Sequence, residues 1–155
     1  MRFLPIVLAC AAGLAATACT SSKKVDAMQQ DSPATATSPL FASKWELAEI
    51  MGKAVEPGPD GRRPHLVLDA AQERAFGFAG CNRFSGGFTV DEATGRITLG
   101  PLAATMMACA SMEVETAFME ALQTADNYTL VDGVLSLNKA RMAPLARLQA
   151  APLDK

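Results

Sequence analysis

The sequence contains little histidine, few cysteines and no excess of basic residues. His65 is its only histidine, and Cys81 and Cys109 are the only cysteines after residue 19. A serine or cysteine nucleophile would therefore lack its usual base, and the cysteines lack the paired spacing of zinc sites. With 14 basic and 16 acidic residues, the chain is not basic enough to indicate nucleic-acid binding. We expect a protein that is not an enzyme and that holds no metal and no cofactor.

The long apolar run of the chain stands at its N-terminus. It extends from Phe3 to Leu14, follows the basic Arg2, and is separated from Cys19 by small residues. This layout predicts a secretory signal peptide over residues 1–18, too short to span a bilayer permanently. A cysteine directly after the small residues is typical of bacterial lipoproteins, so we expect Cys19 to carry a lipid anchor. An ordinary signal peptide is one alternative; processing at Cys10 would leave an apolar region of only about seven residues.

The chain after the signal peptide begins with a polar segment. Residues 19–42 are poor in large apolar side chains and predict a flexible tether, and residues 43–150 form one domain long enough for its own core. Thr20, rather than aspartate, follows Cys19, and in a host with two membranes the resemblance to sorted lipoproteins then favours the periplasmic face of the outer membrane. In any other host we expect an exported, membrane-anchored protein.

Short alternating apolar stretches in the domain predict strands. Phe76 and Phe78 share one face of their strand, and Asp132-Gly133 is a two-residue turn typical of a tight hairpin. The loop 56–64 is rich in proline and glycine, and we interpret its arginines as solvated. Glycines inside or beside the strands indicate a strongly curved sheet. The expected strands lie near residues 45–50, 66–68, 76–78, 84–90, 97–99, 128–130, 135–137 and 145–148.

One amphipathic helix is predicted between the fifth and sixth strands. Its apolar positions run from Val114 to Ala125 at helical spacing, and its acids, Glu113, Glu115 and Glu120, are expected on its solvent face. The predicted fold class is α+β: a strongly curved antiparallel sheet, barrel-like but incompletely closed, of about seven or eight short strands with one packed helix.

Cys81 and Cys109 lie on either side of the middle strands. An exported protein meets an oxidising environment, so we expect these cysteines to form a disulfide. Closing this loop would stabilise the fold by about 3.6 kcal/mol on the chain-entropy model. Two free, buried thiols are the alternative.

Two further groups of residues admit a structural and a recognition role. Asn82 suits a turn in which its side chain bonds the backbone, and Arg83 suits a contact with carbonyl groups or an acid; both could instead form an exposed recognition patch. Met106, Met107, Met112 and Met119 cluster near the helix start. Methionine fills cores adaptably, and we expect that role here, with a groove for a peptide or lipid as the alternative.

Several ordered motifs resemble the META domain, or HslJ-like, family. They are GCNRFSG at residues 80–86, ITLGPLAATMMAC at residues 97–109 and the glutamate-rich helix that follows, and the resemblance extends over about residues 43–149. Met106 stands where the family often has a basic residue, so a role of that basic side chain does not carry over.

The resemblance implies a function without a defined reaction. Through this family, the chain resembles small exported lipoproteins linked to heat shock, envelope stress and novobiocin resistance. The fold that the resemblance implies is similar to that of secretin pilot lipoproteins. We therefore expect a non-enzymatic envelope lipoprotein that acts in envelope maintenance or stress tolerance by binding a protein or an apolar ligand. The alternative is a pilot-like or inhibitor-like interaction module that acts on an envelope assembly or a hydrolase.

Overall fold

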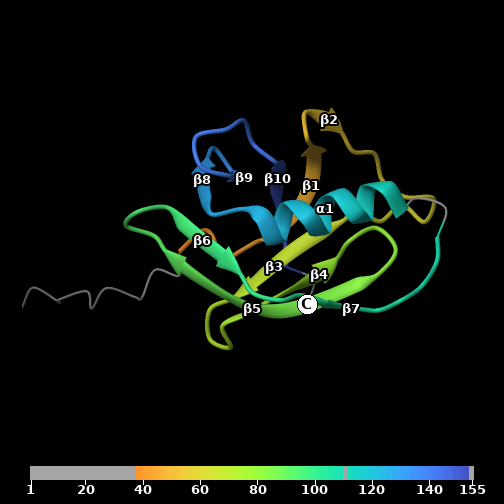
Figure 1. Ribbon diagram of the computed structural model, residues 1–155, viewed down its shortest axis with the longest axis horizontal. Helices are drawn as coiled ribbons and strands as arrows, with labels where there is room; N and C mark the ends of the chain where they lie inside the picture. The colour runs from red at the N-terminus through yellow and green to blue at the C-terminus, as the bar shows by residue number, and fades with distance from the viewer. Residues whose placement is uncertain (1–37, 110–111, 154–155) are drawn as a thin grey trace, which may run out of the picture. The chain divides into compact units, whose positions relative to one another are not determined.

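The computed structural model describes residues 38–109 and 112–153. Over these residues the chain forms ten strands and one helix (Figure 1). The strands are β1 (Lys44–Ile50), β2 (Lys53–Ala54), β3 (His65–Asp69), β4 (Arg74–Phe78), β5 (Arg83–Asp91), β6 (Arg96–Leu99), β7 (Ala103–Ala104), β8 (Asn127–Val131), β9 (Val134–Asn138) and β10 (Ala146–Ala151), and the helix is α1 (Met112–Thr124).

Eight of the described strands form a closed antiparallel ring. Their order is β1-β3-β4-β5-β6-β8-β9-β10, and β10 pairs with β1 to close it. The predicted α+β class and curved sheet are confirmed, but the sheet closes where an incomplete closure was expected. One residue pair, Arg96 with Asn127, joins β6 to β8, which makes this the weakest seam of the ring. Closure leaves fewer unpaired strand edges exposed to solvent.

The helix follows β6 and β7 and precedes β8, so it lies between the fifth and sixth strands of the ring, as predicted. Figure 1 shows α1 crossing the ring, with its nearest strand neighbours in β1 and β6. Phe118 and Leu122 of α1 are fully buried. The Phe118 ring packs edge-on against the Phe84 ring, with 6.2 Å between the ring centres. Burying each such side chain contributes about 1.5–3 kcal/mol, which is what holds the helix on the sheet.

Large side chains fill the interior of the ring. The alternation of strand residues places one set inside and the other outside, and the inner set is almost free of polar groups. The largest fully buried side chains are Trp45, Phe118, Leu40, Leu47, Leu66, Leu68, Ile97, Leu122, Leu135, Leu137 and Leu148.

The packed structure begins before residue 43. Leu40 is 1 % exposed, and its carbonyl accepts a buried hydrogen bond of 2.8 Å from the indole nitrogen of Trp45. The predicted tether, residues 19–42, is therefore part of the domain over residues 38–42. Its remainder and the predicted signal peptide lie outside the described residues.

The hairpin between β8 and β9 forms at the predicted turn. Val131 pairs with Val134, and Asp132 and Gly133 between them have φ values of 50° and 75°. Both values are the positive φ that a tight two-residue hairpin turn requires, which aspartate and glycine tolerate better than other residues.

Candidate functional site

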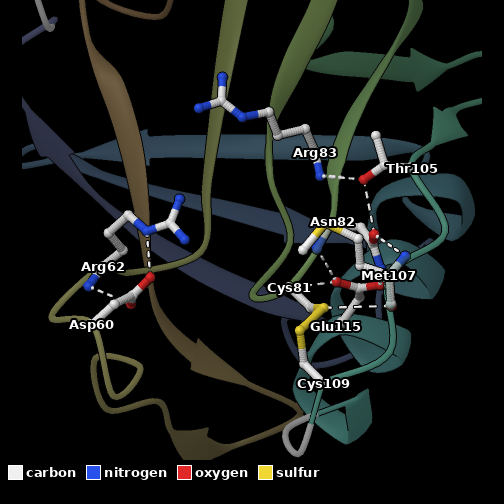
Figure 2. Close-up of a disulfide and its surroundings, with 9 residues drawn as sticks. All are labelled: Asp60, Arg62, Cys81, Asn82, Arg83, Thr105, Met107, Cys109 and Glu115. Atoms are coloured by element: carbon white, nitrogen blue, oxygen red, sulfur yellow. Dashed lines mark hydrogen bonds and ion pairs between the residues drawn. A yellow bond between two sulfur atoms is a disulfide. The ribbon is translucent and has the colours of Figure 1, made fainter.

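The candidate site centres on the turn before β5, where the structure joins Cys81 and Cys109 in a disulfide (Figure 2). Cys81 is buried and Cys109 is exposed. The bond ties the chain after β7 to this turn, across a sequence separation of 28 residues. The predicted pairing is thus the one that the structure contains.

Asn82 is buried, with 2 % of its surface exposed, and its side chain organises the segment after β7. Its amide oxygen accepts hydrogen bonds from the backbone nitrogen of Met107 at 2.7 Å and from the hydroxyl of Thr105 at 2.8 Å. Its amide nitrogen donates to the Met107 carbonyl at 3.0 Å. The structural interpretation of Asn82 is therefore correct, and the residue is not available to a partner.

Glu115 completes this network from the first turn of α1. One carboxylate oxygen accepts the backbone N–H groups of Cys81 at 3.0 Å and Asn82 at 2.7 Å, and the other accepts the Asn82 side-chain nitrogen at 2.6 Å. Glu115 is only 7 % exposed, so its predicted place on the solvent face of the helix is wrong. A buried carboxylate is costly unless hydrogen bonds satisfy it, and three donors do so here.

The backbone before the disulfide is shaped to present these donors. Gly80 has a φ of 128°, in the range that side chains disfavour, and it directly precedes the two N–H groups that Glu115 accepts. Glycine adopts this conformation without steric cost. The positive φ at residue 80 therefore explains why this position of the motif is a glycine.

The polar network binds a strap of chain to the sheet. We use the name strap for residues 105–109, which follow β7 and end at the disulfide. Thr105 and Arg83 exchange hydrogen bonds: the Thr105 backbone nitrogen donates to the Arg83 carbonyl at 3.0 Å, and the Arg83 backbone nitrogen donates to the Thr105 hydroxyl at 3.2 Å. The strap is thus fixed at both ends, covalently by Cys109 and by hydrogen bonds at Thr105.

The side chains of Arg83 and Asn82 point in different directions, although the two residues are adjacent in sequence. The Arg83 side chain is exposed, and Figure 2 shows its guanidinium pointing away from Asn82 and Thr105. Among the described residues, its guanidinium has no acidic partner. The expected contact with a carbonyl or an acid is therefore not found, and Arg83 remains accessible for recognition.

The methionines near the helix start do not fill the core as predicted. Met106 is 99 % exposed, and Met107 and Met112 are also exposed; only Met119 packs partly against the core. The strap explains this, because its contacts use the Met107 backbone and leave both of its methionine side chains outside. We call Met106, Met107 and Met112 the methionine surface.

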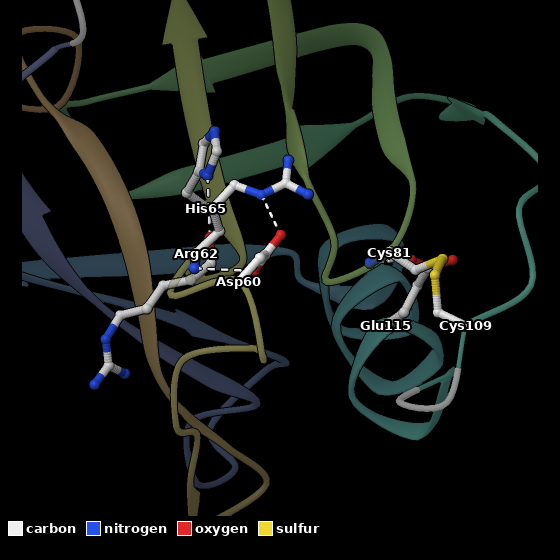
Figure 3. A network of polar contacts seen from close by, with 7 residues as sticks. Asp60, Arg62, His65, Cys81, Cys109 and Glu115 are labelled. Atoms are coloured by element: carbon white, nitrogen blue, oxygen red, sulfur yellow. Dashed lines mark hydrogen bonds and ion pairs between the residues drawn. A yellow bond between two sulfur atoms is a disulfide. The ribbon is translucent and has the colours of Figure 1, made fainter.

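A second group of polar side chains lies on the outer face of β3 and β4, apart from Glu115 and the disulfide (Figure 3). Arg62 pairs with Asp60 and lies 4.3 Å above the centre of the Phe78 ring. His65 is half-buried beside the same ring, with ring centres 6.2 Å apart. The hydrogen bond from Arg62 lowers the pKa of the Asp60 carboxyl. Arg62 is exposed, as expected for a solvated loop arginine, and it also makes these two contacts.

Among the described residues, no cluster of three or more histidine, cysteine or acidic side chains could hold a metal ion. Over the same residues, none of the helices has the length and apolar character needed to cross a membrane. Cys19, the predicted lipidation site, lies outside the part of the chain that the structure describes.

The comparison with protein families decides the identity of the domain. The META domain model matches residues 38–152, most of the chain, and begins two residues before the buried Leu40. The chain belongs to the META domain family. This confirms the resemblance that the motifs at residues 80–86 and 97–109 indicated, and membership supports a protein of the cell envelope.

Solved structures share this fold. An NMR structure of a protein is 26 % identical, with a TM-score of 0.59 and coverage of 75 % of this chain and 97 % of that one. An NMR structure of a protein from Burkholderia xenovorans is 25 % identical, with a TM-score of 0.53 and coverage of 75 % and 85 %. A crystal structure of a DUF4847 family protein from Bacteroides vulgatus, at 15 % identity, a TM-score of 0.52 and coverage of 74 % and 96 %, is similar in fold alone. No curated protein matches the META domain chain in sequence.

Proposed function

We propose that this META domain protein is a non-enzymatic lipoprotein that is anchored through Cys19 and binds a partner protein through its outer surface. In a host with two membranes the anchor lies in the outer membrane and the domain in the periplasm. The proposed role is envelope maintenance or stress tolerance. Family membership supports a location in the cell envelope. The exposed side chains of Arg83, Met106 and Met107 support binding.

The filled interior is the observation that favours a protein over an apolar ligand. Trp45 and Phe118 are among the fully buried side chains that occupy the ring, and ligand pockets need concave space of about 300 Å³ or more. The hollow between α1 and the β1–β2 turn, beside Met51 and Ala121, measures about 90 Å³. It is too small for a lipid chain. A larger hollow of about 370 Å³ is lined by exposed loop residues such as Glu56 and Pro59 and lies outside the filled interior, so recognition is expected on the outside of the domain.

Two exposed surfaces are available for a partner. The methionine surface is apolar and adaptable, and methionine is frequent where one surface binds several partners. The outer face of β3 to β5 combines exposed arginines with phenylalanine, a combination that is enriched in protein interfaces. The methionine surface lies on the strap and at the start of α1, and the other surface meets the strap at Arg83, whose backbone is hydrogen-bonded to Thr105.

Crosslinking in intact cells tests the binding proposal. A single stoichiometric partner, captured by the wild-type protein and not by an unrelated lipoprotein at equal expression, supports the proposal. If that partner belongs to a secretion assembly or is a hydrolase, the narrower pilot-like or inhibitor-like function is the correct one. Lipid that co-purifies without any protein partner would contradict the preference for a protein.

The anchor is tested by blocking lipidation. Globomycin treatment or Cys19→Ala should halt processing, so that the precursor with residues 1–18 still attached accumulates in place of the mature lipidated protein. Cys10→Ala is the matched control and should leave processing unchanged. Unaltered processing and membrane association of Cys19→Ala would show that the anchor is wrong.

A further inference from the structure

We propose that the outer face of β4 and β5 binds an extended acidic peptide segment of a partner protein, with one apolar side chain of the segment between two acidic ones. This inference rests on the proposed function and names the chemistry of the partner. It uses Arg74, Phe76, Phe78, Arg83 and Ser85, which we call the β4–β5 face.

The strand register places these side chains together. Phe78 pairs with Arg83, and Phe76 pairs with Ser85, so the four side chains form two neighbouring cross-strand pairs. Ala75, which lies between Arg74 and Phe76 in β4, is fully buried in the core. Because successive side chains of a strand point to opposite faces, Arg74, Phe76 and Phe78 point outward. This explains why Phe76 is 41 % exposed.

The face is hollowed between its arginines. A hollow of about 260 Å³ is lined by Arg62, His65, Phe76, Gly77, Phe78 and Arg83. Phe76 supplies its exposed ring, whereas Phe78 is only 4 % exposed beneath the Arg62 guanidinium. Such a hollow is large enough for one side chain and offers both apolar contact and charge.

The positive charge of the face is not neutralised by its own acids. Arg62 is paired with Asp60, and Lys44 is paired with Glu46 at 3.3 Å. Arg83 has no acidic partner among the described residues, and the guanidinium of Arg74 donates to the neutral hydroxyl of Ser85 at 3.1 Å.

One acid, Asp69, lies opposite Arg74 and offsets part of the charge of that arginine, which leaves the charge of Arg83 in excess. Asp69 pairs with Arg74 across the strands, and its carboxylate accepts the backbone N–H groups of Ala71 and Gln72 in its own turn. The chain as a whole carries a net charge of −2. The β4–β5 face is thus locally opposite in sign to the molecule, which favours approach of an acidic partner.

The spacing of the arginines sets the spacing of the acids. Arg74 is four residues from Phe78, whose cross-strand neighbour is Arg83, so the Cα atoms of the two arginines stand on the order of 13 Å apart along the strand direction. The Arg74 guanidinium leans from its own position toward Ser85. Two acids at positions i and i+4 of an extended peptide have the same separation. The residue at i+2 then faces Phe76, which is why it should be apolar.

The test uses the full-length protein in detergent and a fluorescein-labelled peptide, Gly-Glu-Thr-Val-Thr-Glu-Gly. The comparison peptide, Gly-Glu-Glu-Thr-Val-Thr-Gly, has the same composition with adjacent acids. Fluorescence anisotropy at 0.05 and 0.15 M salt should show saturable binding of the first peptide, with the second weaker by roughly fivefold, since each exposed ion pair contributes little on its own. Equal affinity for the two peptides would overturn the proposed spacing.

Substitutions of exposed residues locate the binding site of the peptide. Arg83→Gln and Phe76→Ser should each weaken the first peptide by roughly threefold to tenfold. Arg147→Gln, an outward-facing arginine of β10 that pairs with Glu49, is the matched control and should change affinity less than about twofold. A loss with Arg147→Gln as large as that with Arg83→Gln would show non-specific attraction and overturn the site. Unfolding curves confirm that each variant is folded.

Two further measurements separate this inference from its alternatives. If glutarate displaces the peptide at concentrations near the peptide's own Kd, the hollow takes small carboxylates and the peptide proposal is wrong. A photo-crosslinking residue at Phe76 should capture the partner in cells, whereas one at Met106 should not. Capture at Met106 alone would leave the proposed function standing and overturn the β4–β5 face, while capture at neither position, with no chemically crosslinked partner, would overturn both.

Discussion

The carboxylate of Glu115 lies 2.6 Å from the side-chain nitrogen of Asn82, and this contact joins α1 to the disulfide turn. The two residues are 33 positions apart, and both are buried. Asn82 in turn holds the Met107 backbone, so helix, turn and strap form one hydrogen-bonded unit. This arrangement makes the motif residues structural and leaves recognition to their exposed neighbours.

Glu115→Ala should destabilise the domain by about 2–4 kcal/mol, because three buried donors at Cys81 and Asn82 would lose their acceptor. Glu115→Gln should lose much of the same free energy, since one of its two terminal groups becomes a donor that faces donors. Urea unfolding measures the change. Glu113→Ala, on the exposed side of the same helical turn, is the control and should cost less than about 1 kcal/mol. Equal effects of the two alanine variants would contradict the role given to Glu115.

We expect the Cys81–Cys109 disulfide to be present in the protein and to stabilise its fold. Alkylation without reductant, followed by mass spectrometry, should leave Cys81 and Cys109 unmodified. Replacing both cysteines by alanine should lower the free energy of unfolding by about 3.6 kcal/mol if the loop-closure model applies. The strap should stay in place in this variant, because Asn82 and Thr105 still hold it. Two alkylated thiols in the untreated protein would show that the bond does not form.

The sequence carried enough information to predict the sheet, the helix and the disulfide. Alternation in residues 45–50 and 84–90 identified strands, and Asp132-Gly133 identified a hairpin, because these signals are local. Closure of the ring was not predictable in the same way. It depends on pairing β1 with β10, whose residues are about 100 positions apart, and no local pattern encodes such a contact.

The candidate site was only partly predictable. Glu115 was assigned to solvent because acids usually are, yet it lies at i−3 from Phe118 and i−7 from Leu122, on the buried face of the helix. That spacing was a usable signal. The exposed methionines carried no comparable signal, since their position follows from the strap, which tertiary hydrogen bonds hold against the turn.

Stability at acid pH should depend on Asp126. A hydrogen bond from the Ala140 backbone nitrogen, and a second from the Asn127 side chain, lower the pKa of the Asp126 carboxyl. A lowered pKa in the folded state means that the stabilisation is present above the unfolded pKa of about 4 and is lost as the pH falls through the folded value. Asp126→Asn should therefore lower Tm at pH 7, and the difference from wild type should shrink below about pH 4.

The control for this experiment is Asp132→Asn, in the β8–β9 turn. Asparagine suits such a turn, so Tm should change little at either pH. A difference between wild type and Asp126→Asn that stays constant from pH 7 to strongly acid conditions would contradict the proposed hydrogen bonds of the ionised carboxylate.

Gly77→Ala should disrupt the pairing of β3 with β4. A Cβ atom at this position would lie 2.0 Å from the His65 carbonyl oxygen and 3.0 Å from the Phe84 ring, and neither the backbone nor the packed ring can move away cheaply. We expect a loss of about 3 kcal/mol in the free energy of unfolding, typical of severe overpacking. Gly87→Ala is the matched control, because its Cβ would meet only the Glu73 carbonyl at 3.9 Å. Urea unfolding of both variants checks the prediction, and a Gly77→Ala variant as stable as Gly87→Ala would mean that the two strands lie farther apart than described.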